Sequence, residues 1–307
     1  MNIAHKANKQ YKLLEYIFLK MADFGILYVV STPIGNLADM TPRAVTILDQ
    51  VDIIACEDTR SSKTLLNRFD IKTKCLSYHE HSDERATDVI MEKIQKGENI
   101  ALISDAGTPL ISDPGFKLVR KARALGISII PIPGSCAAIS ALSVSGLNTD
   151  AFLFKGFLPR KREDRKNTLE QIRDYQHTII FYESPHRVLE SIKDMKLILG
   201  NKRKIFMARE MTKLFETYFS GTIGELTEFI EKDPSNTKGE IVLIVEKCGE
   251  DATKLKKDHR RILKLLLSEM SSSKAASIAA KITGENKKLL YKEAIMLLEN
   301  DKQTDSQ

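Results

Sequence analysis

Short runs rich in Val and Ile alternate with segments of helical periodicity through the first half of the chain. The runs are largely apolar on both faces and lie at Ile26–Val30, Val51–Ala55, Ile100–Ile103 and Ile127–Ile132. Apolar residues recur at helical spacing in Thr41–Gln50, Ala86–Lys96 and Phe116–Leu125. Strands that are apolar on both faces and joined through helices are typical of a parallel sheet with right-handed crossovers. This alternation predicts an α/β domain whose ligand lies beyond the carboxyl ends of its strands.

The second half of the chain has a different pattern. After an alanine- and serine-rich helix expected at Cys136–Ser145, strands are expected at Phe152–Phe157, His177–Tyr182, Ile205–Arg209, Phe215–Ser220 and Ile241–Glu246. Their connections include helices expected at Asn167–Tyr175, His186–Leu199 and Ile223–Glu231. We therefore expect a mixed sheet, and two α/β domains over residues 25–148 and 149–248, with the boundary near Leu147–Asp150.

Basic residues dominate the C-terminal segment. Lys254–Lys292 holds eleven Lys or Arg against three acidic residues. Helical segments are expected at Lys254–Met270, Ser273–Ile282 and Lys287–Asn300, separated by short turns, as in a helix-turn-helix. Residues 249–307 are therefore expected to form a small basic helical domain. A solvated helical tail and a nucleic-acid-binding unit both fit this charge.

Composition excludes several classes of protein. Four well-separated cysteines without a C-x-x-C pair argue against a disulfide framework or a zinc ribbon and favour a reducing cytoplasm. No apolar stretch reaches the roughly 18 residues that a membrane span needs. The apolar run near the N-terminus is interrupted by Glu15 and lacks a cleavage site, so residues 1–24 are expected to be an extension rather than a secretory signal, with the domain beginning near Met21.

Three loops that follow expected strands are dense in Gly, Pro, Ser and Thr. They are Ser31–Leu37, Ser104–Gly115 and Pro131–Ser135, and their shared position on one rim of the sheet predicts a ligand cleft. The chain lacks a P-loop, a G-x-G-x-x-G turn and a G-x-S-x-G elbow, which disfavours an NTPase, a dinucleotide-binding domain and a serine hydrolase. His79-Glu80-His81 is a weak metal candidate without a partnering cluster, so no metal is expected.

Charged residues gather at two strand-to-helix turns, Cys56–Lys63 and Tyr182–Arg187, and in Pro159–Lys166. The carboxylates there are suited to capping helices and pairing with arginines. The cations are equally suited to binding phosphates across a cleft.

Several longer strings match, in order, motifs of one known family. They are Leu27–Leu37, Cys56–Arg60, Ser104–Pro109, Ser112–Gly115, Pro133–Ser135, Phe181–Arg187, Ala208–Glu210, Phe215–Glu216 and Lys238–Glu240. With these motifs the chain resembles the ribosomal RNA small subunit methyltransferase I group of the tetrapyrrole methylase superfamily. The resemblance spans roughly Ile26 to Glu246, and the basic C-terminal helices are similar to that group's small helical domain.

The resemblance implies two α/β domains with S-adenosylmethionine between them. It implies methyl transfer to the ribose 2′-hydroxyl of a cytidine in the decoding region of 16S (small-subunit) rRNA, in the cytoplasm, and a homodimer. The partner is then small-subunit rRNA or the small ribosomal subunit, and no membrane is involved. By analogy with the superfamily, the cofactor contacts Pro33, Asp105, Thr108, Ser135, Cys136, Tyr182, Ala208 and Gly239.

The chemistry of the implied reaction suggests further residues. A ribose hydroxyl is a very weak acid, so a base that accepts its proton helps, and Glu57, Asp58, Glu183 and His186 are unranked candidates. Contacts to the RNA backbone are expected from Arg60, Lys63, Arg160, Arg187 and Arg209. Two alternatives stay open: a tetrapyrrole (precorrin or uroporphyrinogen) methyltransferase, which needs a broad porphyrin cleft, and a non-catalytic RNA-binding assembly factor, which does not bind S-adenosylmethionine.

Overall fold

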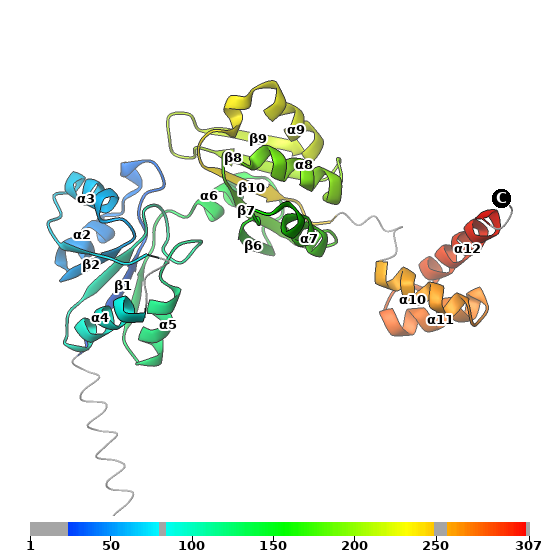
Figure 1. Ribbon diagram of the computed structural model, residues 1–307, viewed down its shortest axis with the longest axis horizontal. Helices are drawn as coiled ribbons and strands as arrows, with labels where there is room; N and C mark the ends of the chain where they lie inside the picture. Colours follow the sequence, from blue (N-terminus) through cyan, green and yellow to red (C-terminus); the bar gives the residue numbers. More distant parts are fainter. Residues whose placement is uncertain (1–23, 80–83, 249–256, 305–307) are drawn as a thin grey trace, which may run out of the picture. The chain divides into compact units, whose positions relative to one another are not determined.

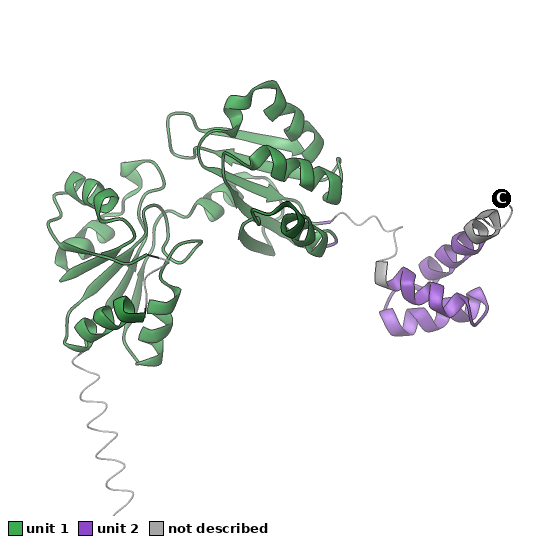
Figure 2. Cartoon of the chain, in the orientation of Figure 1, with its two compact units in different colours: residues 1–173, 177–247 green, residues 174–176, 248–307 purple. Residues whose placement is uncertain are grey.

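A computed structural model of the chain describes residues 24–79, 84–248 and 257–304. Contacts within it divide the chain into two compact units (Figure 2). Unit 1 comprises residues 1–173 and 177–247, and unit 2 comprises residues 174–176 and 248–307. Unit 1 contains both sheets, and the predicted extension lies outside the described residues up to residue 23.

The first sheet is wholly parallel, as its apolar runs predicted (Figure 1). Its strands are β1 (Leu27–Val30), β2 (Ile53–Cys56), β3 (Lys74–Ser77), β4 (Ile100–Ile103) and β5 (Ile129–Ile132), in the order β3-β2-β4-β1-β5. The connecting helices are η1 (Leu37–Asp39), α2 (Pro42–Gln50), α3 (Thr59–Arg68), α4 (Glu84–Gln95) and α5 (Phe116–Ala124). One apolar cluster packs α4 and α5 against the sheet, and another packs α2 and α3 against it. Both faces are therefore buried, which explains the continuous apolar runs.

Local sequence determines where these helices begin. Thr41 caps α2, because its hydroxyl accepts a hydrogen bond from Ala44 N at 3.1 Å, and Pro42 occupies the first turn. The sequence patterns missed β3 and α3. The edge strand β3 exposes Lys74 and Ser77 and therefore lacks a continuous apolar run.

The second sheet is mixed, as predicted. Its strands are β6 (Phe152–Phe157), β7 (Thr178–Glu183), β8 (Lys204–Arg209), β9 (Thr217–Thr222) and β10 (Ile241–Val245), in the order β6-β7-β10-β8-β9. Only β6 and β7 pair in parallel. One face packs against α7 (Arg162–Ile172), α8 (Val188–Leu199) and α9 (Ile223–Lys232). The other packs against α6 (Ala137–Val144), which follows β5, and η2 (Pro234–Thr237) precedes β10.

Two boundaries in this half differ from the predicted ones. Helix α7 begins five residues before the expected Asn167, so Arg162–Lys166 lies in its first turns and not in a loop. Its start is polar and charged, and the apolar periodicity begins only with Leu169 and Ile172. Strand β9 begins two residues after the expected Phe215, which lies exposed in the preceding turn.

Unit 2 consists of three helices in its described part. They are α10 (Lys257–Leu267), α11 (Ser272–Thr283) and α12 (Lys287–Thr304). Small alanines of α11 pack against leucines of α10 and α12, with Ala275, Ala276 and Ala279 fully buried. The α11–α12 turn uses Gly284 in the left-handed region, at φ +72°. Of the helices in the described ranges, none is both long and apolar enough to cross a membrane.

Candidate active site

The three glycine- and proline-rich loops meet at the carboxyl end of the first sheet, as predicted from their shared rim. Thr32 and Gly107 exchange backbone hydrogen bonds, with N–O distances of 2.9 and 3.1 Å. The Thr108 hydroxyl donates to Ser135 O and also lies 2.9 Å from the hydroxyl of Ser31. Gly107 lies at φ +86°, a conformation that favours glycine. The loops after β1, β4 and β5 therefore form one connected rim.

A cavity of about 550 Å³ lies beside this rim, between residues of both sheets. Four of the eight predicted cofactor residues line it: Thr108, Cys136, Tyr182 and Gly239. The other four support its walls or lie nearby. Pro33 is buried next to the lining residue Ile34, and Ser135 accepts the Thr108 hydrogen bond. Asp105 is exposed and accepts a hydrogen bond from Asp58 N at 3.3 Å, and Ala208 is buried in the β8 core.

The second half of unit 1 supplies the opposite wall. The Tyr182 hydroxyl accepts a hydrogen bond from Ala138 N at 3.2 Å, and burial raises the pKa of this phenol. Gly239 lies at φ +87°, and a Cβ there would lie 2.4 Å from the carboxyl carbon of Glu210. That carboxylate accepts hydrogen bonds from Glu240 N at 2.8 Å and Lys213 Nζ at 2.9 Å. Partial burial opposes ionisation, but these hydrogen bonds lower the pKa of Glu210 overall.

The lining is chemically suited to an adenosine joined to an amino acid. Apolar side chains of Ile34, Ile111 and Val242 offer surfaces for an aromatic base. The hydroxyls of Thr108 and Tyr182 offer polar contacts, and the volume lies in the range of small-molecule sites. The residues present therefore fit S-adenosylmethionine.

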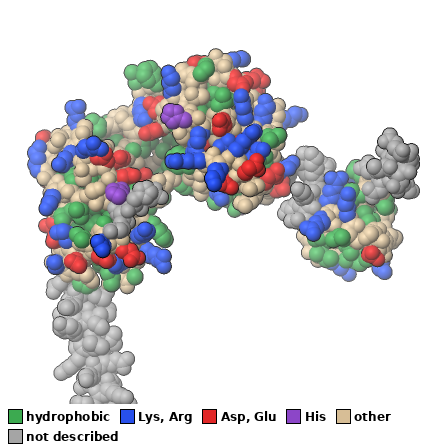
Figure 3. Space-filling model, viewed as in Figure 1, with side chains coloured by type: hydrophobic (Ala, Val, Ile, Leu, Met, Phe, Trp, Pro, Cys, Tyr) green, Lys and Arg blue, Asp and Glu red, His purple; other side chains and the backbone are tan. Residues whose placement is uncertain are grey.

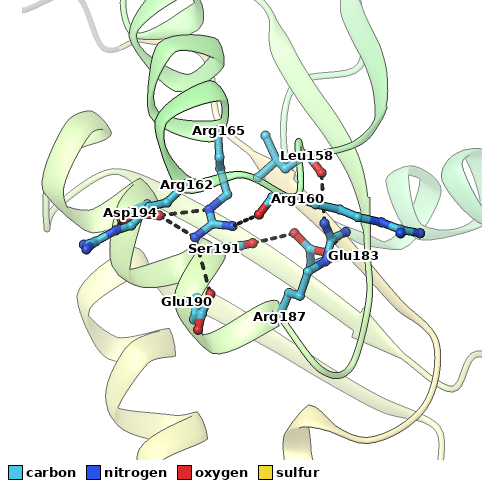
Figure 4. Close-up of polar contacts among 9 residues, drawn as sticks. All are labelled: Leu158, Arg160, Arg162, Arg165, Glu183, Arg187, Glu190, Ser191 and Asp194. Carbon is cyan, nitrogen blue, oxygen red and sulfur yellow. Dashed lines mark hydrogen bonds and ion pairs between the residues drawn. The ribbon is translucent and has the colours of Figure 1, made fainter.

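Glu183 is deeply buried and fully hydrogen-bonded (Figure 4). Its side chain is 0% exposed and accepts from Ser184 N at 2.7 Å, Arg187 Nη2 at 2.9 Å and Ser191 Oγ at 2.6 Å. Arg187 is 20% exposed in its side chain and also donates to Leu158 O. This predicted base and this predicted phosphate-binding arginine are thus engaged with each other.

A second buried ion pair lies beside the first (Figure 4). Arg165 of α7 is 1% exposed, and its Nη2 lies 2.8 Å from Asp194 Oδ2 of α8. Arg162 contacts the same carboxylate at 3.1 Å. Arg165 also donates to the backbone carbonyl of Arg160. The side chain of Arg160 is exposed. The pair joins α7 to α8 and fixes the loop that carries Arg160.

The remaining candidate bases and RNA-contacting cations differ in how exposed their side chains are. Asp58 caps α3 by accepting from Arg60 N at 2.7 Å, and hydrogen bonds from Arg60 lower the pKa of Asp58. The Arg60 side chain is 91% exposed, and Lys63 and His186 are also exposed. Arg209 donates to Phe215 O and Thr217 Oγ1 at the β8–β9 connection and to Lys238 O in the loop before β10, so its guanidinium is engaged in structural contacts. Glu57 is half-buried at the end of β2.

The sequence patterns missed one carboxylate of the cavity. Asp113 lines it and is half-buried. Burial raises the pKa of this carboxyl to about 6, the Glu57 and Asp105 carboxylates add to the rise, and a hydrogen bond from Ser104 opposes it. Asp113 belongs to the quoted string Ser112–Gly115, but nothing in that string distinguished it from a turn residue.

No cluster of three or more metal-ligating side chains occurs among the described residues. In the weak metal candidate, Glu80 and His81 lie outside them.

Comparison with known proteins agrees with this architecture. The sequence model "Tetrapyrrole (Corrin/Porphyrin) Methylases" matches residues 26–227, and the model "RsmI C-terminal HTH domain" matches residues 253–298. The crystal structure of the methyltransferase CobJ is 16% identical, with a TM-score of 0.55 over 76% of this chain and 97% of that one. Uroporphyrin-III-C-methyltransferase from Thermus thermophilus is 18% identical, with a TM-score of 0.50 over 73% and 95%. Fold and cavity together define a methyltransferase of the tetrapyrrole methylase class, which uses S-adenosylmethionine.

Closer relatives specify the family within that class. Ribosomal RNA small subunit methyltransferase I of Haemophilus influenzae is 48% identical over 277 residues, which cover 90% of this chain and 98% of the relative. The protein of the same name from Escherichia coli O157:H7 is 47% identical over 88% of this chain and 95% of the relative. The chain belongs to the ribosomal RNA small subunit methyltransferase I family.

Proposed function

We propose that this protein methylates the ribose 2′-hydroxyl of a cytidine in the decoding region of 16S rRNA, in the cytoplasm. The observation that carries the proposal is its similarity to relatives named as small-subunit rRNA methyltransferases, which extends over almost their whole length. That similarity is joined by a match to the family's helix-turn-helix domain over residues 253–298.

We assign the cofactor to the cavity between the sheets. Thr108, Cys136, Tyr182 and Gly239 line it and are proposed to contact S-adenosylmethionine. Pro33, Asp105, Ser135 and Ala208 are proposed to hold the surrounding loops and strand. When bound, the cofactor supplies a methyl group activated by a positively charged sulfur. The protein then has to align the acceptor oxygen and exclude water from it.

Exposed cations are the proposed contacts to the RNA backbone. In unit 1 these are Arg60, Lys63 and Arg160, whereas Arg187 and Arg209 are assigned to structural contacts. Figure 3 shows Lys and Arg side chains on the second half of unit 1 and, separately, on unit 2. The exposed cations of unit 2 include Arg261, Lys264, Lys274, Lys281, Lys287, Lys288 and Lys292. Such contacts predict an affinity for RNA that falls with salt.

A tetrapyrrole methyltransferase shares the fold but has no use for a basic helical domain. A non-catalytic assembly factor has a use for that domain but none for a cofactor cavity. The combination of both features in one chain favours the rRNA methyltransferase over either alternative. We also propose a homodimer, because homodimers are expected for this superfamily.

The test is transfer of labelled methyl from S-adenosylmethionine to small ribosomal subunits that lack their normal rRNA modifications. We expect label in the rRNA, released after nuclease digestion as 2′-O-methylcytidine and identified by mass spectrometry. Label on a base, or on another nucleoside, would overturn the proposed acceptor. Transfer to a tetrapyrrole but not to subunits would favour the first alternative.

A second measurement separates the enzyme from the assembly factor. Calorimetry should detect S-adenosylmethionine binding, and Asp105→Ala should abolish it without changing the unfolding temperature. Asp88→Ala is the matched control, because Asp88 lies on α4 of the same domain and its one ion pair within the described residues is with Lys121 at the surface. Equal affinities of the two variants would remove Asp105 from the site.

A further inference from the structure

Four carboxylates line the cavity, and three of them are paired with cations. Glu183 lies 2.9 Å from Arg187 Nη2. Glu210 and Glu240 lie 2.9 and 3.0 Å from the same Lys213 Nζ. For the fourth, Asp113, no Lys, Arg or His within the described ranges forms an ion pair. The positive charges are therefore distributed so that one carboxylate facing the cavity is left without a counter-ion.

The backbone holds Asp113 in place. The loop between β4 and α5 turns through left-handed conformations at Leu110, φ +73°, and Ser112, φ +68°. The Ser112 hydroxyl lies 3.1 Å from the position that a Cβ on Gly156 would occupy, where β6 is irregular. The loop of the first half thus abuts a strand of the second, and the Ser104 hydroxyl donates to Ala106 O and Gly107 O within the same loop. These contacts fix a carboxylate at the junction of the two halves.

We propose that Asp113 is the base that accepts the proton of the attacking ribose hydroxyl. The inference rests on the proposed 2′-O-methylation and deepens it by naming a residue for the proton transfer. The hydroxyl oxygen forms a bond to the methyl carbon while the bond from that carbon to the sulfonium sulfur breaks, and its electron pair stays on sulfur. The hydroxyl proton moves to an Asp113 carboxylate oxygen and is later released to water.

The electrostatics of the site suit this role. The groups that face Asp113 are the Glu57 carboxyl at the end of β2, the Asp105 carboxyl in its own loop and the Tyr182 phenol on β7. With a pKa of about 6, Asp113 is a stronger base than an ordinary carboxylate and is still ionised at neutral pH.

Two of the four sequence-predicted bases, Glu183 and Asp58, compare less well. The carboxylate oxygens of Glu183 accept three hydrogen bonds from within the protein. Asp58 caps α3, and its pKa is shifted in the opposite direction, away from that of a useful base.

The experiment compares Asp113→Asn with wild type in single-turnover methyl transfer to hypomethylated small subunits. We expect the rate of the variant at pH 7.5 to fall about 100-fold or more, the lower range for a general base. The affinity for S-adenosylhomocysteine, measured by calorimetry, should change less than about threefold. In wild type the rate should level off above about pH 6, and Asp113→Asn should lose that inflection.

A readout independent of activity is ¹³C NMR of protein labelled at aspartate carboxyl carbons. One resonance should titrate near pH 6 and be absent from Asp113→Asn. Asp88→Asn is the matched control: it removes an exposed carboxyl of the same domain, and it should preserve both the rate and that resonance.

The outcomes separate this proposal from the proposed function. A wild-type rate in Asp113→Asn, with methyl still placed on a cytidine ribose, would refute the base and leave the function intact. Loss of cofactor affinity parallel to the rate would reassign Asp113 to cofactor binding. Wild-type protein that methylates a base instead of a ribose would refute the function itself.

Discussion

Replacing Asp113 by Asn should stabilise the protein at neutral pH while removing its activity. The carboxyl has a pKa of about 6 in the folded protein, against an ordinary value of 3.8. Folding therefore takes up a proton between about pH 4 and pH 6, and this carboxyl lowers the folding stability as the pH rises through that window. The asparagine is neutral at every pH, so the variant avoids that loss.

The size of the effect follows from the shift. About two pKa units at roughly 1.4 kcal/mol each set an upper bound of about 3 kcal/mol, and because solvent screens this half-buried carboxyl we expect about 1–2 kcal/mol at pH 7 and above. For a unit the size of unit 1, about 1–2 kcal/mol corresponds to a rise in Tm of roughly 2–8 °C.

The assay is thermal unfolding of wild type and Asp113→Asn, followed by circular dichroism at several values between pH 4 and pH 8. The difference between the two proteins cancels the titration of every group that does not interact with Asp113. It should be close to zero at pH 4, increase through pH 5–6 and stay constant above pH 7. A difference independent of pH, or a variant less stable at pH 8, would refute the view of Asp113 as an unpaired, desolvated carboxylate.

Three further substitutions or deletions test other parts of the structure. Gly239→Ala should weaken cofactor binding by about tenfold or more, as measured by calorimetry. Gly239 has a left-handed backbone conformation, and a Cβ there would overlap the Glu210 side chain. Glu183→Gln should destabilise the fold by about 2–4 kcal/mol in urea unfolding, because it leaves the partly buried Arg187 without its counter-charge. Deletion of residues 249–307 should weaken binding to small subunits at least tenfold in filter assays. It should leave cofactor affinity unchanged, since the domain has its own apolar core. Equal losses of subunit binding and cofactor binding would indicate a structural role for the domain.

The sequence predicted those parts of the fold in which burial is uniform. The interior strands β2 and β4 are buried at every position, and their continuous apolar runs were unambiguous. The pattern failed for α3, which has only two buried residues among its ten, Ser62 and Leu66. Leu65 and Leu66 are the only apolar residues of this segment, which is too few to separate a helix from a polar loop.

The sequence also located the site, but it did not rank the residues within it. Loop motifs identified the rim, because Gly107 and its neighbours are needed for the close approach of the backbone. The acidic residues at the strand ends could not be distinguished by sequence, since each has a cation nearby in the chain. Their roles depend on which cations reach them, and that is a property of the folded chain.

Asp113 and Glu183 illustrate this dependence. Each is followed four residues later by a cation, Lys117 and Arg187 respectively, so their local patterns are equivalent. The turn after Glu183 brings Arg187 back to within 2.9 Å of its carboxylate. After Asp113, Gly115 at φ +134° redirects the chain into α5, and Lys117 is exposed there without an ion pair to Asp113. The backbone that follows each carboxylate thus determines whether the cation four residues later pairs with it.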